Sequence, residues 1–119
     1  MSKAGNLGAY ARDLDRCSAN HVALSPLSFL ERSALVYPDK IAVVHGKSSY
    51  SYRALRARCG RLAAALARRG IGAGDTVSVL APNIPALLEA HYGIPMLGAV
   101  LNAINTRLDA DTIAFILQH

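Results

Sequence analysis

Two short, mainly apolar segments, residues 76–81 and 99–103, constrain the fold of this chain more than any other feature. Mainly apolar runs of this length are typical of strands that need cover on both faces. A third apolar segment, 41–45, predicts another buried strand, and the alternating residues 49–52 predict its hairpin partner. With the helices described next, the predicted order is α-β-β-α-β-α-β-α. This order indicates an α/β sheet with its strands flanked by helices.

The most regular element is a predicted helix that begins near Tyr52. Apolar side chains recur at helical spacing within about one third of the helical wheel. They are Tyr52, Leu55, Cys59, Leu62, Ala63 and Leu66. Gly70 should end the helix in a left-handed cap, with Ile71 contacting Leu66 across it.

Three further helices have recognisable ends. Their predicted capping residues are Ser25 or Ser28 for the first helix, Asn83 for the middle one, and Asp109 or Asp111 for the last. Pro38 stops the first helix after about Val36, and Pro95 should kink or end the middle helix. The middle helix is apolar almost all round, so we expect it to be buried on more than one side.

The chain divides into two parts on this evidence. Residues 1–24 show no sustained periodicity and are predicted to be a flexible N-terminal arm. Residues 25–119 contain only four short strands, too few to cover the two apolar ones on both faces. We therefore expect 25–119 to be the first part of a larger, incomplete domain, with a complete small α/β domain as the alternative.

The net charge of +5 raises the question of nucleic-acid binding, but the excess lies in one helix. Segment 52–69 has no acidic residue and holds Arg53, Arg56, Arg58, Arg61, Arg68 and Arg69. Elsewhere the charges nearly balance, and no aromatic residues alternate with these arginines to stack on bases. We expect a solvated helix surface and no nucleic-acid partner. Contacts of this surface with phosphate or CoA are the alternative.

Several sequence motifs resemble phosphate-binding or metal-binding sites, but the residues around them do not fit such sites. Gly46-Lys47-Ser48 resembles the end of a phosphate loop, but Ile41 stands where that loop needs its first glycine, so a hairpin turn is expected. The glycines at 70, 72 and 74 follow a helix instead of a strand, which indicates a cap and a turn. His21, His45, His91 and His119 match no metal-ligand spacing, and Glu89 and His91 do not share a helix face. We expect His91 to be a hydrogen-bonded packing residue.

The composition indicates what class of protein this is and in which cellular compartment it is expected. With 52% apolar and 18% charged residues, the chain is not disordered. No segment is apolar enough for a transmembrane helix, and the first 20 residues lack the core of a secretory signal. Cys17 and Cys59 make neither a disulfide framework nor a zinc cluster, so both are expected to be free thiols. A cytoplasmic location is predicted, with the peroxisome as the alternative.

The order of four segments resembles the acyl-activating, adenylate-forming ligases, most closely the plant and bacterial short- and medium-chain acyl-CoA synthetases. The segments are Ser18–Arg32, Tyr50–Leu55, Gly74–Asn83 and Gly98–Leu108. The resemblance implies the N-terminal part of the large domain of an AMP-binding ligase. Such enzymes couple a carboxylic acid to ATP, form an acyl-adenylate, and transfer the acyl group to CoA.

The resemblance also implies catalytic motifs that are not found in this sequence. The family uses a Ser/Thr/Gly-rich loop with a lysine around the triphosphate, Mg²⁺, an acid at the ribose, and a lysine on a mobile domain. None of these motifs occurs in the sequence, so no catalytic, cofactor-binding or metal-binding residue is assigned. We expect the chain alone to be inactive. The alternative is a non-enzymatic α/β binding module that self-associates through an exposed sheet edge.

Overall fold

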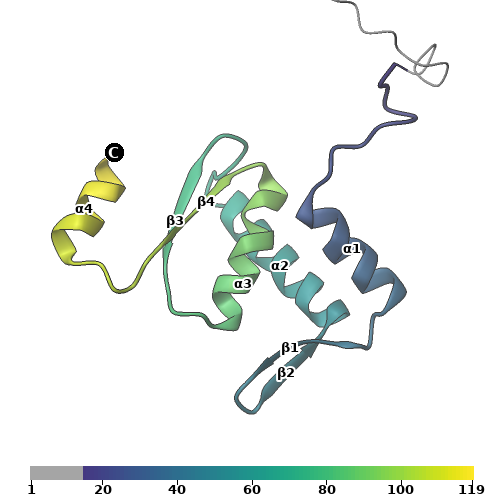
Figure 1. Ribbon diagram of the computed structural model, residues 1–119, viewed down its shortest axis with the longest axis horizontal. Coiled ribbons are helices and arrows are strands. Elements are labelled where there is room, and N and C mark those ends of the chain that lie inside the picture. Colours follow the sequence, from purple (N-terminus) through teal and green to yellow (C-terminus); the bar gives the residue numbers. More distant parts are fainter. Residues whose placement is uncertain (1–14) are drawn as a thin grey trace, which may run out of the picture.

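The computed structural model describes residues 15–119, which form helices around two small sheets (Figure 1). The elements in chain order are α1 (Pro26–Val36), β1 (Ile41–His45), β2 (Ser48–Ser51), α2 (Tyr52–Ala67), β3 (Thr76–Leu80), α3 (Pro85–Gly93), the 3₁₀ helix η2 (Pro95–Leu97), β4 (Val100–Ile104) and α4 (Ala110–Gln118). The predicted order of helices and strands and the α/β class are therefore confirmed.

The strands do not join into one sheet, as the sequence led us to expect. Strands β1 and β2 form an antiparallel hairpin in which Val43 lies opposite Tyr50. Strands β3 and β4 form a separate parallel pair in which Val77 lies opposite Leu101. Because α3 and η2 connect β3 to β4, the second half of the chain is a β-α-β unit.

Helix α2 lies between the other helices and joins two apolar clusters (Figure 1). Its N-terminal half contributes Leu55 and Cys59, which are buried together with Leu30 of α1. Its C-terminal half contributes Leu62 and Leu66 to a second cluster of residues from α3, η2, β3 and β4. These contacts confirm the predicted apolar face of α2. Burial of each large apolar side chain on this face stabilises the fold by about 1.5–3 kcal/mol.

The ends of α2 follow from local chemistry. The Ser51 hydroxyl accepts a hydrogen bond from the Ala54 N–H at 3.3 Å and caps the N-terminus. At the other end Gly70 has a φ of 86°, and its N–H donates to the Ala67 carbonyl at 2.9 Å. The Ile71 N–H donates to the Leu66 carbonyl at 3.2 Å, so the predicted cap is confirmed as a Schellman motif.

Two of the other predicted helix caps are correct and one is wrong. The Ser25 hydroxyl accepts from the Leu27 N–H, and the Asp109 carboxylate accepts from the Thr112 N–H. Asn83 does not cap α3, because the helix starts one residue later and its N-cap residue is Ile84. Ile84 has no side-chain acceptor, and Pro85 at the first helical position has no N–H that needs one.

Helices α2 and α3 cross closely at Gly93. A Cβ atom added there would lie 3.0 Å from the Cys59 carbonyl oxygen and 3.0 Å from Leu62 Cδ2. A side chain at this position would therefore require α2 and α3 to move apart by a few tenths of an ångström. Helix α3 then ends at Gly93, and Pro95 begins η2, as the proline predicted.

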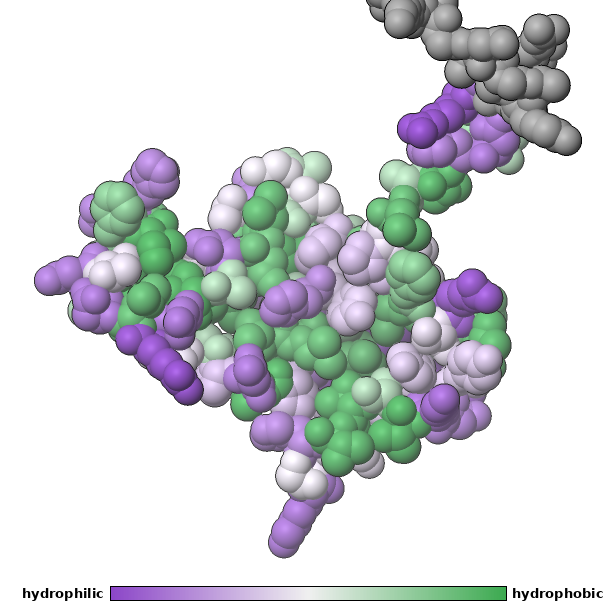
Figure 2. Space-filling view, in the orientation of Figure 1, coloured by the Kyte–Doolittle hydropathy of each residue, from purple (hydrophilic) through white to green (hydrophobic). Residues whose placement is uncertain are grey.

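The predicted burial of the strands is wrong in part. Strand β1 was expected to be buried, but Ile41 is 53% exposed and Val44 is 73% exposed, because the hairpin is covered on one side only. In the parallel pair, Leu80 and Val100 are 54% and 55% exposed. Figure 2 shows that apolar side chains reach the surface over the middle of the molecule and near the hairpin. Both sheets therefore have cover on one face within residues 15–119.

The two ends of the described chain pack least. Residues 15–24 form a turn at Ser18–Asn20 and no helix or strand, whereas residues 1–14 of the predicted arm lie outside the described part. Helix α4 has no buried residue, and Figure 1 shows it apart from α1, α2 and α3. Within residues 15–119, no helix has the length and apolar character needed to cross a membrane.

Candidate functional site at the carboxyl ends of the parallel strands

The carboxyl ends of β3 and β4 meet at the same edge, since the two strands run parallel. The segments that follow them, 81–83 and 105–107, line a cleft of about 560 Å³ together with Ile104 and, on α3, Leu87 and His91. In open α/β sheets, ligands bind in the crevice outside the carboxyl ends of the strands. Topology thus identifies this cleft as the candidate site.

The cleft is lined by hydrogen-bonding groups with one permanent positive charge. Asn83, Asn105 and Thr106 contribute amide and hydroxyl groups, and Arg107 contributes a guanidinium. The Asn105 carbonyl oxygen Oδ1 accepts from the Arg107 N–H at 3.0 Å, which shapes the loop after β4. Within residues 15–119 Arg107 forms no salt bridge, so its donors are free for an oxyanion.

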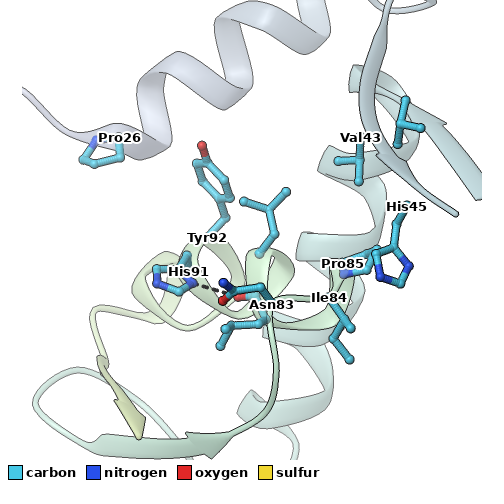
Figure 3. A pocket seen from close by; sticks show the side chains of 11 residues that line it. Pro26, Val43, His45, Asn83, Ile84, Pro85, His91 and Tyr92 are labelled. Carbon is cyan, nitrogen blue, oxygen red and sulfur yellow. Dashed lines mark hydrogen bonds between the residues drawn. The ribbon is translucent and has the colours of Figure 1, made fainter. Parts of the chain in front are cut away.

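A second hollow of about 570 Å³ lies against the same face of α3 (Figure 3). It is an apolar groove between α3 and β1, with Pro26 from the start of α1. Its apolar lining is Pro26, Val43, Val44, Ile84, Pro85, Leu87 and Leu88. Its polar or titratable lining is His45, Asn83, His91 and Tyr92. Asn83, Leu87 and His91 line both hollows.

His91 is hydrogen-bonded as predicted, but it does not pack in the core. Its Nδ1 lies 2.8 Å from the Leu87 carbonyl oxygen, one helical turn back, and the residue is exposed. A carbonyl can only accept, so Nδ1 carries the proton and Nε2 is the free ring nitrogen. The sequence interpretation of His91 as a packing residue is therefore wrong, because the apolar residues around it surround an open groove.

Three of the four arginines on α2 are paired with acidic residues of other segments. Arg53 bonds Asp39 at 3.2 Å and Arg56 bonds Glu31 at 2.9 Å, both at the surface. Exposed pairs of this kind contribute about 0–1 kcal/mol each, so they orient the side chains more than they stabilise the fold. This arrangement agrees with the predicted solvated surface.

The third pair is different, because Glu89 of α3 is buried. Arg58 Nε donates to Glu89 Oε1 at 2.6 Å, and the Arg58 guanidinium lies 4.7 Å from the centre of the Tyr50 ring. The hydrogen bond and charge of Glu89 raise the pKa of Arg58 above its ordinary value. Burial, with a smaller effect of Glu89, raises the pKa of the neighbouring Cys59 thiol to about 11.

The other motifs that the sequence singled out have structural roles. Gly46 and Lys47 form the hairpin turn, with Gly46 at a φ of 58°. The glycines at 70, 72 and 74 form the cap of α2 and the turn before β3. His119 stacks on Phe115, away from His45 and His91. In the described part of the chain no three His, Cys, Asp or Glu side chains form a metal site. Cys17 and Cys59 are free thiols.

Sequence reasoning missed Asn83, Asn105 and Arg107 as candidate site residues. A usable signal was present, because polar residues directly follow both predicted apolar strands at 76–81 and 99–103. If those strands are parallel neighbours, their polar successors share one edge. The parallel pairing was the missing information.

A β-α-β unit with a donor-lined cleft beyond its strands defines part of an α/β domain. Comparison with known proteins identifies which kind. The model of the family described as AMP-binding enzyme matches residues 30–119. The chain belongs to this family of adenylate-forming ligases, as the four sequence segments indicated.

Plant acid–CoA ligases are among its similar relatives. The peroxisomal acetate/butyrate–CoA ligase of Arabidopsis thaliana is 55% identical over 107 residues, which are 90% of this chain and 19% of that protein. The acetate–CoA ligase of Humulus lupulus is 50% identical over 115 residues, 97% of this chain and 20% of that protein. The chain therefore spans about a fifth of the length of these relatives.

A solved structure shows the same arrangement of elements. The O-succinylbenzoate–CoA synthetase of Bacillus subtilis, in complex with ATP and magnesium, superposes with a TM-score of 0.71 at 26% identity. The match covers 76% of this chain and 25% of that one. The fold is thus part of an adenylate-forming ligase fold.

Proposed function

We propose that this chain is the N-terminal part of an acid–CoA ligase, which activates a carboxylic acid with ATP and transfers the acyl group to CoA. The observation that carries the proposal is the family match over 30–119 together with relatives at 50% identity or more that are named CoA ligases. The carboxylic acid and CoA are the partners that this function requires.

The cleft beyond β3 and β4 is the part of this chain that would face an anionic substrate. Arg107 supplies a fixed charge, and Asn83 and Asn105 supply amide donors at the same edge. A guanidinium surrounded by neutral donors binds a phosphate or carboxylate without a competing internal carboxylate. The role of the chain is to hold this edge in place through the β-α-β unit and α2.

The chain by itself does not catalyse adenylation under this proposal. Its sequence has no Ser/Thr/Gly-rich, lysine-bearing loop for the triphosphate, and its described residues hold no cluster that fits Mg²⁺. The remaining machinery belongs to segments that the relatives have outside the matched fifth.

A chimera tests this function. This chain replaces the matching region of the Arabidopsis acetate/butyrate–CoA ligase, and acetyl-CoA formation is measured. The chimera is expected to be active, and Arg107→Gln in it should raise the KM for CoA or ATP by about tenfold, the value of a lost charge-assisted hydrogen bond. Arg61→Gln, on the exposed side of α2, is the matched control and should leave KM unchanged.

Two results would each contradict one part of the proposal. One is an inactive chimera that is folded and soluble, since this chain would then not supply the ligase function of its region. The other is ATP–pyrophosphate exchange above a protein-free blank with the 119-residue chain and a panel of short and medium acids. The second result would reject only the proposed inactivity of the chain alone.

A non-enzymatic, self-associating module is the alternative function. The exposure of Leu80 and Val100 favours it, because each strand of the parallel pair has a free edge and one uncovered face. Size-exclusion chromatography with light scattering discriminates between the two. A dimer that persists at micromolar concentration supports association, whereas a monomer with a cooperative melting transition contradicts it.

The compartment remains a prediction. Free cysteines suit a reducing compartment such as the cytoplasm. The names of the Arabidopsis acetate/butyrate–CoA ligase and benzoate–CoA ligase place those two proteins in the peroxisome, which supports the alternative. Fluorescent tagging of the native gene product, with a peroxisomal marker, separates the two locations.

A further inference from the structure

Arg58 of α2 contacts the β1–β2 hairpin and α3 at the same time. Its Nε donates to Glu89 Oε1 of α3 at 2.6 Å, and its guanidinium carbon lies 4.7 Å from the centre of the Tyr50 ring of β2. Both the hairpin and α3 lie beside α2 (Figure 1). Among the described residues no hydrogen bond or ion pair joins Tyr50 to Glu89 directly, so Arg58 is the polar link between them.

The guanidinium of Arg58 can make both contacts because they use different parts of the group. The Nε–H lies in the plane of the guanidinium and donates to the carboxylate, whereas the face of the plane stacks on an aromatic ring. A ring centre at 4.7 Å lies within the range of about 6 Å over which a cation is attracted to such a ring. A lysine ammonium has no planar group that could donate to Glu89 and stack on Tyr50 at once.

Burial distinguishes this contact from the two exposed ion pairs of α2. Glu89 is 8% exposed, so its carboxylate has little access to water. Without Arg58 this carboxylate would lose its donor in a buried position, which is costly. Glu89 thus holds the guanidinium in one orientation, and Tyr50 packs against the group that Glu89 has oriented.

Apolar contact also joins the hairpin to α3. Val43 of β1 and Tyr92 of α3 pack against the same buried cluster, which contains Leu55 and Cys59. Apolar burial is non-directional, whereas a hydrogen bond weakens steeply when its angle changes. The cluster therefore explains why the hairpin and α3 stay together, and a directional contact is needed to explain a single relative position.

We propose that Arg58 is a positioning residue that couples the β1–β2 hairpin to α3 and fixes their relative position. Glu89 orients the guanidinium, and the guanidinium orients Tyr50 and with it the hairpin. Because β1 and α3 both line the apolar groove of Figure 3, the width of that groove depends on this contact. The inference concerns the conformation of the chain and does not use the proposed function.

A mutant cycle followed by urea denaturation tests the coupling. Tyr50→Leu removes the ring and leaves the ion pair, whereas Glu89→Leu removes the carboxylate and leaves the ring. Tyr50→Leu should raise the equilibrium constant of unfolding at least about threefold more in the native chain than in Glu89→Leu, because each partner lowers the entropy that Arg58 loses on meeting the other. In Arg58→Met this difference should vanish. As the control, Tyr50→Leu and Asp39→Asn, which affects an exposed pair, should be additive.

A distance measurement tests the position of the hairpin apart from stability. Spin labels are attached at Lys47→Cys in the hairpin turn and at Ala86→Cys in α3, both exposed positions. Cys17→Ser removes the exposed native thiol, and the buried Cys59 is left in place. Pulsed electron paramagnetic resonance then gives the distribution of distances between the hairpin and α3.

The native chain is expected to give one narrow distribution. Arg58→Met should broaden it, and Arg58→Lys should broaden it as well, because a lysine restores the charge without the planar group. Tyr50→Phe keeps the ring and should leave the distribution narrow, whereas Tyr50→Leu should broaden it. Arg56→Met, which removes an exposed ion pair on the same helix, is the matched control and should leave the distribution narrow.

Three results would overturn the proposal. The first is additivity of Tyr50→Leu and Glu89→Leu in the native chain. The second is a coupling that is equally large in Arg58→Met, since the apolar cluster would then transmit it. The third is an unchanged distance distribution in Arg58→Met. If Arg58→Met does not fold, narrow distributions in both Arg58→Lys and Tyr50→Leu would overturn the proposal, because each of these variants keeps a cation beside Glu89.

Discussion

At the scale of single residues, the two cysteines illustrate how position determines reactivity. Cys17 is exposed in the segment before α1, whereas Cys59 is fully buried between α2 and its neighbours. Burial disfavours the thiolate, and the negative charge of nearby Glu89 adds to this effect, so the pKa of Cys59 rises to about 11. The thiolate is the reactive form.

Iodoacetamide should therefore label Cys17 within minutes at about pH 8 and leave Cys59 unmodified. With a pKa of about 11, only about one Cys59 in a thousand is ionised at that pH. Mass spectrometry of peptides after timed labelling measures both rates. In guanidinium both cysteines should react, which is the control, and equal rates in the native chain would contradict the described burial of Cys59.

The same shift links stability to pH. The folded pKa of Cys59 lies above the ordinary value of 9.0, so the buried neutral thiol contributes stability below about pH 9. That contribution is lost progressively as pH rises from about 9 to about 11. Urea denaturation of the chain at pH 8 and at pH 10.5 should show a lower free energy of unfolding at the higher pH.

At the scale of elements, the contact between α2 and α3 holds the two halves of the chain together. It contains an ion pair, Arg58–Glu89, and a close backbone approach at Gly93. The groove and the cleft both use residues of α3. Any change that moves α3 on α2 should therefore change the candidate site as well.

Removal of one partner of the ion pair should destabilise the chain. Arg58→Met leaves the carboxylate of Glu89 buried without its donor, and we expect a loss of about 2–3 kcal/mol, reduced from fully buried cases because Arg58 is partly exposed. Urea denaturation measures the loss. Adding Glu89→Leu should recover most of it, and equal stability of Arg58→Met and the native chain would show that the pair contributes nothing.

Two glycines provide a matched pair of substitutions. Gly93→Ala should lower the free energy of unfolding by about 1–3 kcal/mol, because the new Cβ meets Cys59 and Leu62. Gly60→Ala, at an exposed position of α2 with nothing within 4 Å, should raise it by up to about 1 kcal/mol. Thermal melts followed by circular dichroism compare the two, and similar signs for both would contradict the close crossing.

The helices could be predicted from the sequence more accurately than the burial and pairing of the strands. The apolar stripe of α2 and its glycine cap depend on residues within a few turns, so Leu55, Cys59 and Gly70 could be placed correctly. The burial of β1 and the separation of the two sheets depend on which elements lie beside them, which local pattern does not specify. The cleft was missed for the same reason, since Asn83 and Arg107 meet only through the parallel pairing of β3 and β4.

At the scale of the whole molecule, packing decreases from the centre to the C-terminal end. Helix α2 contributes to both apolar clusters, whereas α4 has no buried residue. Phe115 and Leu117 of α4 are 66% and 58% exposed. Local stability follows buried apolar contact, so the ends of the chain should open independently of the centre.

Hydrogen exchange measured by mass spectrometry should show this gradient. Peptides from α4 (Ala110–Gln118) are expected to exchange within seconds, because little tertiary packing opposes the opening of a nine-residue helix. Peptides from the centre of α2, around Cys59 and Ala63, should exchange most slowly. Equal protection of the two helices would contradict the gradient and would indicate that α4 is covered by another surface in solution.

The parallel pairing of β3 with β4 also has a consequence for synthesis on the ribosome. The hairpin, α1 and α2 can begin to pack on one another as soon as Ala67 has emerged, because Leu30, Val43, Leu55 and Cys59 of their shared cluster precede it, and Tyr92 and Met96 join the cluster later. Strand β3 has no partner strand until Ile104 has left the exit tunnel. In that interval Val77 and Val79 remain in an unpaired apolar stretch, so Thr76–Leu80 is where a chaperone that recognises extended apolar peptides would bind the nascent chain first.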